Sequence, residues 1–237
     1  MKLTTEKRTV LALVLATLCT GVLVATRMLL VESRGYGFLA WNLFLAWIPL
    51  VAALLAQRLT RAHWALWGAA LVGWLAFFPN APYIVTDLMH LRTTRGAPLW
   101  LDVLVVGSAA ATGLLLGLAS LRLVHASLAR RSGKAWVGWV VSLAVCFLAA
   151  LGVYLGRFQR WNTWDLLTKP DELLADAWSA LAEPRLLAFG FLFGLALVVA
   201  YLVYRLLAPE VVLDGDPAAD ADLATVSAPD ARSAPPR

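Results

Sequence analysis

One short stretch, 77–91 (FFPNAPYIVTDLMHL), gathers carboxylate, imidazole, phenol and amide side chains at the end of an apolar run. Tyr83, Asp87 and His90 stand at i, i+4 and i+7, a spacing that places them on one face of an α-helix. A carboxylate and an imidazole on one face can act as acid and base or contribute to a metal site. Two or three ligands of this kind are weak support for a metal, so we predict neither a bound metal nor a cofactor.

A second polar stretch, 156–165 (GRFQRWNTWD), has the side chains needed to recognise an anion. Arg157 and Arg160 lie three residues apart, and a guanidinium group holds phosphate or carboxylate through paired N–H donors. The tryptophans beside them can stack on a sugar or cover an acyl chain. Asn80, in the first stretch, is expected to cap a new helix whose first N–H groups also attract anions.

Polar residues from several segments are predicted to converge at one membrane surface. The candidate catalytic residues are Asp87, His90 and Asp102. The candidate ligand-binding residues are Asn42, Asn80, Tyr83, Arg157, Arg160, Asn162, Trp164 and Asp165. The alternative is structural, because Arg157 or Arg160 could pair with Asp87 or Asp102 and lock helix ends together. Both interpretations are carried forward, and whether the chain is an enzyme stays open.

The elements that would position these residues are membrane helices. Of the 237 residues, 61% are hydrophobic and 15% are charged, and the mean hydropathy is +0.74, which is far more apolar than a soluble domain. We therefore predict an all-α, polytopic membrane protein with about six transmembrane helices in one bundle. No HExxH, GxSxG, P-loop or Rossmann pattern occurs. The basic residues are dispersed among helix ends, so nucleic acid is not an expected partner.

The predicted spans follow the apolar runs. Within a transmembrane domain of residues 1–207 they cover about residues 9–31, 38–56, 62–78, 99–121, 135–156 and 186–207. Pro79 and Pro82 predict a helix break at 79–82, because proline lacks the N–H of a helical hydrogen bond. An amphipathic helix at about 170–182 is expected to lie in the membrane interface. Residues 208–237 are expected to form a disordered, acidic tail rich in Pro and Ala.

Other features outside the candidate site are expected to serve packing or solvation. Gly113–Gly117 and Gly190–Gly194 have the G-x-x-x-G spacing that lets helices approach closely, within this chain or against other membrane proteins. Arg27 is expected to extend to the interface, with an inward orientation toward the site as the alternative. His63 and His125 lie beside basic loops and are expected to be solvated.

The orientation in the membrane follows from the distribution of lysine and arginine. With six spans both termini share a side, and the connections on the two sides can be compared. The side that contains the basic cluster at 130–134 carries slightly more Lys and Arg. We therefore place this cluster and both termini in the cytoplasm, which puts the two polar stretches together on the outer face.

Four segments together carry a resemblance: 42–49 (NLFLAWIP), 77–91 (FFPNAPYIVTDLMHL), 99–102 (LWLD) and 154–165 (YLGRFQRWNTWD). They resemble a family of bacterial multi-pass membrane proteins known as domain of unknown function thirteen sixty-one. The resemblance extends over about residues 10–207. It implies an integral membrane protein of bacteria, and it implies no substrate.

The sequence thus predicts a six-helix bundle in the bacterial cytoplasmic (inner) membrane with an outward-facing polar pocket. We expect this pocket to recognise or process an envelope lipid or an anionic headgroup, with membrane lipids as partners. One alternative is a small-solute transporter gated by the break at 79–82. Against this alternative, no charged residue lies at the midplane of a predicted span, which is where transporters usually bind their substrates. Another is a non-catalytic structural subunit of a membrane complex.

Overall fold

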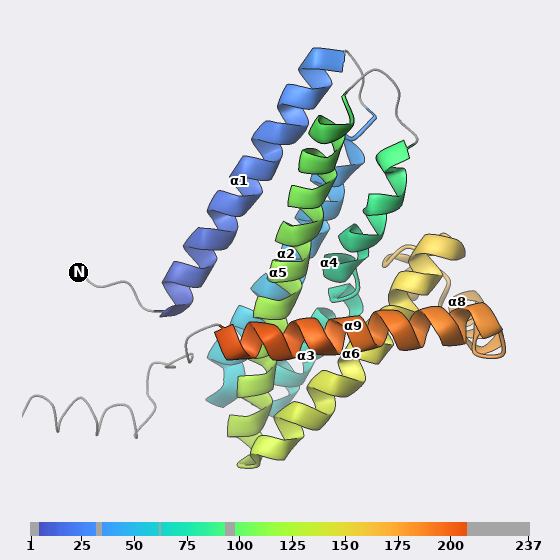
Figure 1. Cartoon of the computed structure of the whole chain (residues 1–237). Helices are drawn as coiled ribbons and strands as arrows, with labels where there is room; N and C mark the ends of the chain where they lie inside the picture. Colours follow the sequence, from blue (N-terminus) through green and yellow to red (C-terminus); the bar gives the residue numbers. More distant parts are fainter. Residues whose placement is uncertain (1–4, 32–34, 62, 93–97, 208–237) are drawn as a thin grey trace, which may run out of the picture.

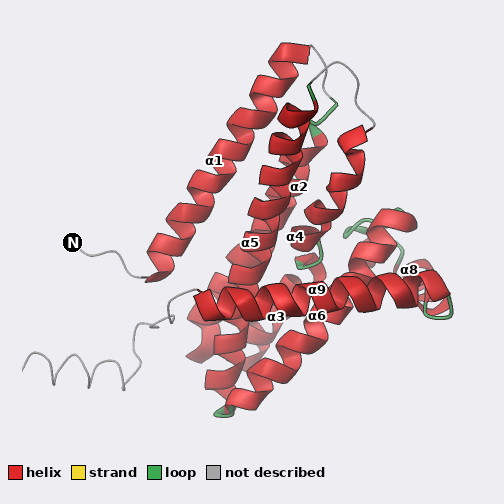
Figure 2. Cartoon of the chain, in the orientation of Figure 1, coloured by secondary structure: helices red, strands yellow, loops and turns green. Residues whose placement is uncertain are grey.

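The structure, a computed structural model, describes residues 5–31, 35–61, 63–92 and 98–207. These residues are almost entirely helical, and no strand occurs among them (Figure 2). Six segments of this described part are long and apolar enough to cross a membrane: Glu6–Val31, Phe38–Arg58, Trp64–Leu91, Leu99–Ser132, Ala135–Phe158 and Pro184–Leu207. The chain is an all-α, multi-pass membrane protein, as the composition predicts. The tail predicted over 208–237 lies outside the described residues.

Helix α5 (Leu99–Ser132) is the central element, with 34 residues. It contacts α1 (Thr5–Val31) and α2 (Phe38–Arg58), and Figure 1 shows these three helices side by side. The fourth span, predicted over 99–121, is therefore only the first part of a longer helix. The helix ends at Gly133, whose φ of +66° is a left-handed conformation that glycine adopts without steric strain.

The third crossing is interrupted, as the prolines predict. It consists of α3 (Trp64–Phe77), α4 (Asn80–Tyr83) and the 3-10 helix η2 (Ile84–Arg92). Because Pro82 cannot donate to the carbonyl of Phe78, that oxygen accepts from Ala81 N at 3.1 Å, the tighter i to i+3 bond of a 3-10 turn. The crossing continues beyond the break to Leu91.

The prediction that Asn80 caps a new helix is wrong. The N-cap position of α4 falls on Pro79, and no side chain caps this helix. The side-chain amide of Asn80 donates instead to Phe77 O at 3.0 Å and to Thr163 Oγ1 at 2.9 Å. The nearby backbone donor of Tyr83 is also bonded, to Pro79 O at 3.0 Å. The short α4 therefore does not supply the free N–H groups that the anion-binding argument needed.

Glycines from two helices enclose the break. A Cβ on Gly113 of α5 would stand 2.9 Å from Ala81 O, and a Cβ on Gly152 of α6 (Ala135–Phe158) would stand 2.8 Å from Pro79 Cγ. Both helices can approach the break this closely only because these positions lack a side chain. Gly113 thus confirms the packing role predicted for the first G-x-x-x-G motif, within this chain. The Gly152–Gly156 motif on the opposite side was not recognised from the sequence.

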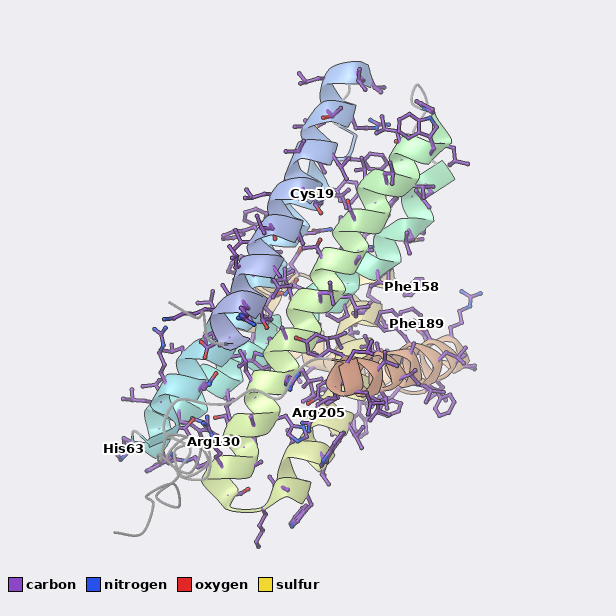
Figure 3. All side chains as sticks on the ribbon, turned by 60° about the vertical axis from the view of Figure 1, so that its left-hand side comes forward. Cys19, His63, Arg130, Phe158, Phe189 and Arg205 are labelled. Atoms are coloured by element: carbon purple, nitrogen blue, oxygen red, sulfur yellow. The ribbon has the colours of Figure 1, made fainter. Side chains whose placement is uncertain are left out.

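The chain after α6 forms α7 (Asp165–Thr168), α8 (Pro170–Ala180) and α9 (Pro184–Leu207). Helix α8 forms where the amphipathic helix was predicted, and of its apolar residues Leu173 is buried whereas Trp178 is 79% exposed. Its position in the membrane interface stays a prediction. Helix α9 packs on α6, and Figure 3 shows Phe158 beside Phe189 at this contact, with ring centroids 5.5 Å apart. In Figure 1, α9 lies across α5 and α6 rather than alongside α1 and α2.

Two side chains predicted at the surface are buried. Arg27 is 0% exposed, and its Nε donates to Asp102 Oδ1 at 3.0 Å. His125 is 5% exposed, and its Nδ1 lies 2.9 Å from the hydroxyl oxygen of Tyr201 on α9. For Arg27 the inward orientation, which was the alternative, is observed, and the prediction that His125 is solvated is wrong. Partners on other helices satisfy these groups inside the bundle, and neither sequence neighbourhood reveals those partners. His63 is exposed, as predicted.

Candidate functional site

Arg157, at the end of α6, is the centre of a polar cluster with side chains of α4 and η2. Its Nη2 donates to Asp87 Oδ1, its Nε donates to Thr86 Oγ1 at 2.8 Å, and its Nη1 lies 3.2 Å from His90 Nε2. Its guanidinium carbon lies 4.2 Å from the centre of the Tyr83 ring, a cation–π contact. The Asp87 side chain is 1% exposed and that of Arg157 is 9% exposed, so the ion pair is buried.

The second carboxylate oxygen of Asp87 is also occupied. Asn42 of α2 donates its Nδ2 to Asp87 Oδ2 at 2.9 Å, so the cluster joins α2, η2 and α6. The structure therefore brings Tyr83, Asp87 and His90 together around Arg157, although the segment after Tyr83 is a 3-10 helix rather than the predicted α-helix. Each oxygen of Asp87 accepts a hydrogen bond from a side chain of the cluster, and the charge of Asp87 is balanced by that of Arg157.

Asp102, the third candidate acid, belongs to another cluster. It pairs with Arg27 of α1, whose guanidinium carbon lies 4.5 Å from the centre of the Tyr36 ring. The hydroxyl of Tyr36 donates to His90 O at 3.4 Å and so links the two clusters. The Nη1 and Nη2 atoms of Arg27 are buried with no hydrogen-bond partner among the described residues. Asp102 thus anchors α1 on α5 and does not line the pocket described next.

A pocket of about 690 Å³ lies beside the Arg157 cluster, between α2, α3, α4, α6 and the segment from Arg160 to α8. One part of its lining is apolar: Leu45, Val72, Leu75, Leu148, Leu151, Leu155, Leu166, Leu173 and Leu174. The other part is polar: Asn42, Asn80, Tyr83, Arg160, Asn162 and Thr163. Three tryptophans complete the wall: Trp41, Trp161 and Trp164. The pocket is therefore amphipathic.

Six of the candidate ligand-binding residues line this pocket: Asn42, Asn80, Tyr83, Arg160, Asn162 and Trp164. The other two, Arg157 and Asp165, do not. Asp165 instead accepts a hydrogen bond from Asn162 N at 2.8 Å through its Oδ2 and so orders the loop that forms the wall. The two arginines that the sequence treats alike consequently have different roles.

Arg160 occupies a special backbone position. Its φ of +65° is left-handed, a conformation that is unfavourable for residues with a side chain and common at the ends of helices. Trp161 N donates to Leu155 O at 3.2 Å across this turn. The side chain of Arg160 is exposed, reaches the pocket wall, and has no carboxylate partner among the described residues. The turn thus ends α6 and directs a cation to the pocket.

Sequence reasoning missed several residues that build the site. Thr163 accepts the amide of Asn80, and Thr86 accepts from Arg157, but an isolated threonine gives no signal in a sequence. Gly152 and Gly156 could have been found from their G-x-x-x-G spacing. No group of three or more His, Cys, Asp or Glu side chains in the described ranges is arranged to hold a metal ion.

Six apolar crossings, one of them broken beside a buried ion pair, define a multi-pass helical membrane protein. More particularly, the chain belongs to the family described as proteins of unknown function (DUF1361), whose model matches residues 41–200. This range contains every residue of the pocket lining and the Asp87–Arg157 pair, but not α1. No curated protein and no solved structure matches the chain.

Proposed function

We propose that this protein binds a membrane lipid in the pocket between α2, α3, α4 and α6 and recognises its anionic headgroup. The single observation that carries this proposal is the mixed lining of the pocket, which combines nine aliphatic side chains with six polar residues that include one arginine. A lipid has the same combination, with an acyl chain joined to a charged headgroup. A polar soluble metabolite has no apolar part that would match the aliphatic side chains.

The polar part of the pocket supports anion recognition through Arg160. A guanidinium group forms charge-assisted hydrogen bonds with phosphate, and these are stronger than bonds between neutral groups. Arg157 is not available for this role, because its three nitrogen atoms contact Asp87, Thr86 and His90. We therefore assign headgroup binding to Arg160 and the shape of the site to Arg157.

The contacts favour binding over catalysis. A general base must lie within reach of the substrate proton, yet the side chain of Asp87 is 1% exposed and does not line the pocket. Asp102 is paired with Arg27, away from the pocket lining. We therefore propose that Asp87, His90 and Asp102 hold the helices in place and that the protein recognises a lipid without transforming it.

We further propose that the pocket faces the outer side of the bacterial cytoplasmic membrane. Arg130 and Arg131 lie in the last turn of α5 and Lys134 lies in the connection to α6, and basic residues at such connections are retained in the cytoplasm. The segment that forms the pocket wall follows α6 and so lies at the opposite end of that helix. A lipid of the outer leaflet would then reach the pocket directly from the membrane.

The test is lipid retention by the purified full-length chain. Protein extracted in mild detergent is washed, and the bound lipid per protein is quantified by mass spectrometry for the wild type, Arg160→Gln and Arg185→Gln. Arg185 is an exposed arginine outside the pocket lining and serves as the matched control. Removing one charge-assisted bond should reduce retained anionic lipid by about tenfold in Arg160→Gln. Equal retention in all three proteins would refute the proposal and leave a structural subunit as the better interpretation.

A small-solute transporter is the second candidate, and one observation favours it. The broken crossing contributes Pro79 and Asn80 to the pocket wall, and discontinuous helices commonly form transporter sites. A cysteine at the lining position Ala76 distinguishes the two functions. A lipid site should react with an impermeant thiol reagent from one side only, whereas alternating access should allow reaction from either side.

A further inference from the structure

We infer that the lipid headgroup is a phosphodiester with a single negative charge that also carries free hydroxyl groups, such as a glycerol or a sugar. This inference rests on the proposed function, because it names the chemical class of the ligand for the same pocket. Three features of the lining carry it: the charge balance, the orientation of the amide groups, and the place of the tryptophans.

The charge of the pocket lining would be balanced by one negative charge on the ligand. Among the described residues that line the pocket, Arg160 is the only charged one. The neighbouring arginine, Arg157, is already neutralised by Asp87. A phosphate monoester with two charges would leave one of them without a cation in a largely apolar pocket, which is unfavourable.

The same balance argues against a zwitterionic headgroup. A primary ammonium group is held most strongly by a carboxylate, and no acidic residue is among the described residues that line the pocket. Two of the acids that follow the lining loop are engaged, since Asp165 accepts from Asn162 N and Asp176 accepts from Trp161 Nε1 at 3.0 Å. A phosphodiester without an amine therefore fits the pocket better than one with an amine.

Two asparagines of the lining, Asn42 and Asn80, each keep a carbonyl oxygen that can accept a hydrogen bond. Asn80 uses its Nδ2 for Phe77 O and Thr163 Oγ1, and Asn42 uses its Nδ2 for Asp87 Oδ2. The carbonyl oxygen of each amide has no hydrogen-bond partner among the described residues and is not fully buried, so it can accept a hydrogen bond from a ligand group that replaces water. Phosphate and ester oxygens are acceptors and cannot donate to it. A headgroup that carries hydroxyls therefore makes hydrogen bonds here that a bare phosphodiester cannot make.

The tryptophans suit a headgroup of this kind. Trp41 and Trp164 each line the pocket and remain about half exposed, at 54% and 48%. An indole ring joins an apolar face to a polar N–H and is favoured where apolar and polar surroundings meet. Such rings can cover the carbon skeleton of a glycerol or sugar while its hydroxyls reach the asparagine carbonyls.

The experiment compares four lipids with identical acyl chains for binding to the full chain by native mass spectrometry. Phosphatidylglycerol carries one negative charge and two hydroxyls, whereas phosphatidylmethanol carries one negative charge and no hydroxyl. Phosphatidic acid is a phosphate monoester that can carry a second negative charge. Phosphatidylethanolamine carries an amine beside its phosphodiester. We expect phosphatidylglycerol to be retained about tenfold more than phosphatidylethanolamine and more than phosphatidylmethanol, in line with one charge-assisted bond. Soluble glycerophosphoglycerol, added as competitor, shows whether the headgroup alone is recognised.

The outcomes separate the two proposals. Equal binding of phosphatidylglycerol and phosphatidylmethanol would overturn the requirement for hydroxyls, and equal binding of phosphatidylethanolamine would overturn the charge argument, while lipid binding itself would stand. Retention of none of the four lipids would overturn the proposed function as well. Arg160→Lys keeps the charge and should keep the preference for phosphatidylglycerol, whereas Arg160→Gln should lose it. The comparison of lipids on the wild type needs no variant and is decisive even if a substitution prevents folding.

Discussion

Arg157 and Arg160 lie three residues apart, yet their guanidinium groups have different surroundings. The side chain of Arg157 is 9% exposed and contacts four neighbours on α4 and η2. The side chain of Arg160 is exposed and lines the pocket. The left-handed turn at Arg160 lies between them, so the side chain of Arg157 contacts the bundle while that of Arg160 lines the pocket, where we propose that it binds the headgroup.

The buried pair leads to a stability prediction. Arg157→Gln leaves the carboxylate of Asp87 buried without its cation, and removing one partner of such a pair destabilises proteins by about 3–5 kcal/mol. We expect a clearly lower midpoint of thermal unfolding in detergent, followed by intrinsic tryptophan fluorescence. The double variant Asp87→Asn/Arg157→Gln removes both charges and should recover part of the loss. A double variant less stable than Arg157→Gln would contradict this account of the pair.

Arg160 gives the opposite prediction. Glycine relieves the left-handed backbone at this position, and this relief is worth about 1 kcal/mol. Arg160→Gly should therefore unfold at the same temperature as the wild type or higher, while its retained anionic lipid falls. The thermal scan and the lipid content are measured on the same preparation. A variant that loses stability and lipid together would indicate that Arg160 holds the fold.

The break in the third crossing shows how whole elements create the pocket. Pro79 and Pro82 end the regular helix, but the break stays compact because α5 and α6 approach it through glycines. Gly152 faces Pro79 and Gly156 faces Tyr83, where a Cβ would stand 3.3 Å from Tyr83 Cε2. Side chains at these positions would push α6 away and with it Arg157 and Arg160.

Gly152 offers a test at the scale of elements. In Gly152→Ala the new Cβ meets the rigid ring of Pro79 at 2.8 Å, and overpacking of this kind costs about 1–3 kcal/mol. We expect a lower midpoint of thermal unfolding in detergent. Gly73→Ala on α3 is the matched control, since nothing lies within 4 Å of its Cβ position. Similar midpoints for the two variants would show that α6 can move away from the break without loss.

At the scale of the whole molecule, the basic residues and the pocket wall lie in different places. In Figure 1 the turn between α5 and α6 is at the bottom, the end of α1 is at the top, and α8 is at the right, level with α9. Figure 3 shows Arg130 and His63 together at the lower end of the bundle. The basic end of α5 is therefore separate from α8, which contributes Leu173 and Leu174 to the pocket wall.

Sidedness is tested by labelling single cysteines in intact cells. Cys19 and Cys146 are replaced by Ala, and a cysteine is introduced at Leu167, which is 83% exposed on α7, or at Lys134. Because basic connections stay in the cytoplasm, we expect an impermeant thiol reagent to label position 167 at once and position 134 only after permeabilisation. The reverse pattern would place the pocket on the cytoplasmic side and remove the basis for an outer-leaflet lipid.

Much of the architecture could be predicted because its causes are local. An apolar run of sufficient length crosses a membrane wherever it occurs in the chain, and a proline interrupts a helix through its own ring. The six crossings, the break at 79–82 and the amphipathic α8 followed from such features. The candidate list also included six residues of the pocket lining, since polar side chains next to membrane helices are scarce enough to stand out.

The sequence by itself determined the class of protein, the number of crossings and the polar residues available for a site. Only the tertiary structure decided that Asp87 pairs with Arg157, that Asp102 pairs with Arg27, that His125 is buried against Tyr201, and that Arg160 reaches the pocket. Each of these contacts joins residues more than fifty positions apart or depends on a single left-handed turn. Hydropathy and helical periodicity describe one segment at a time, whereas pairing depends on which helix faces meet.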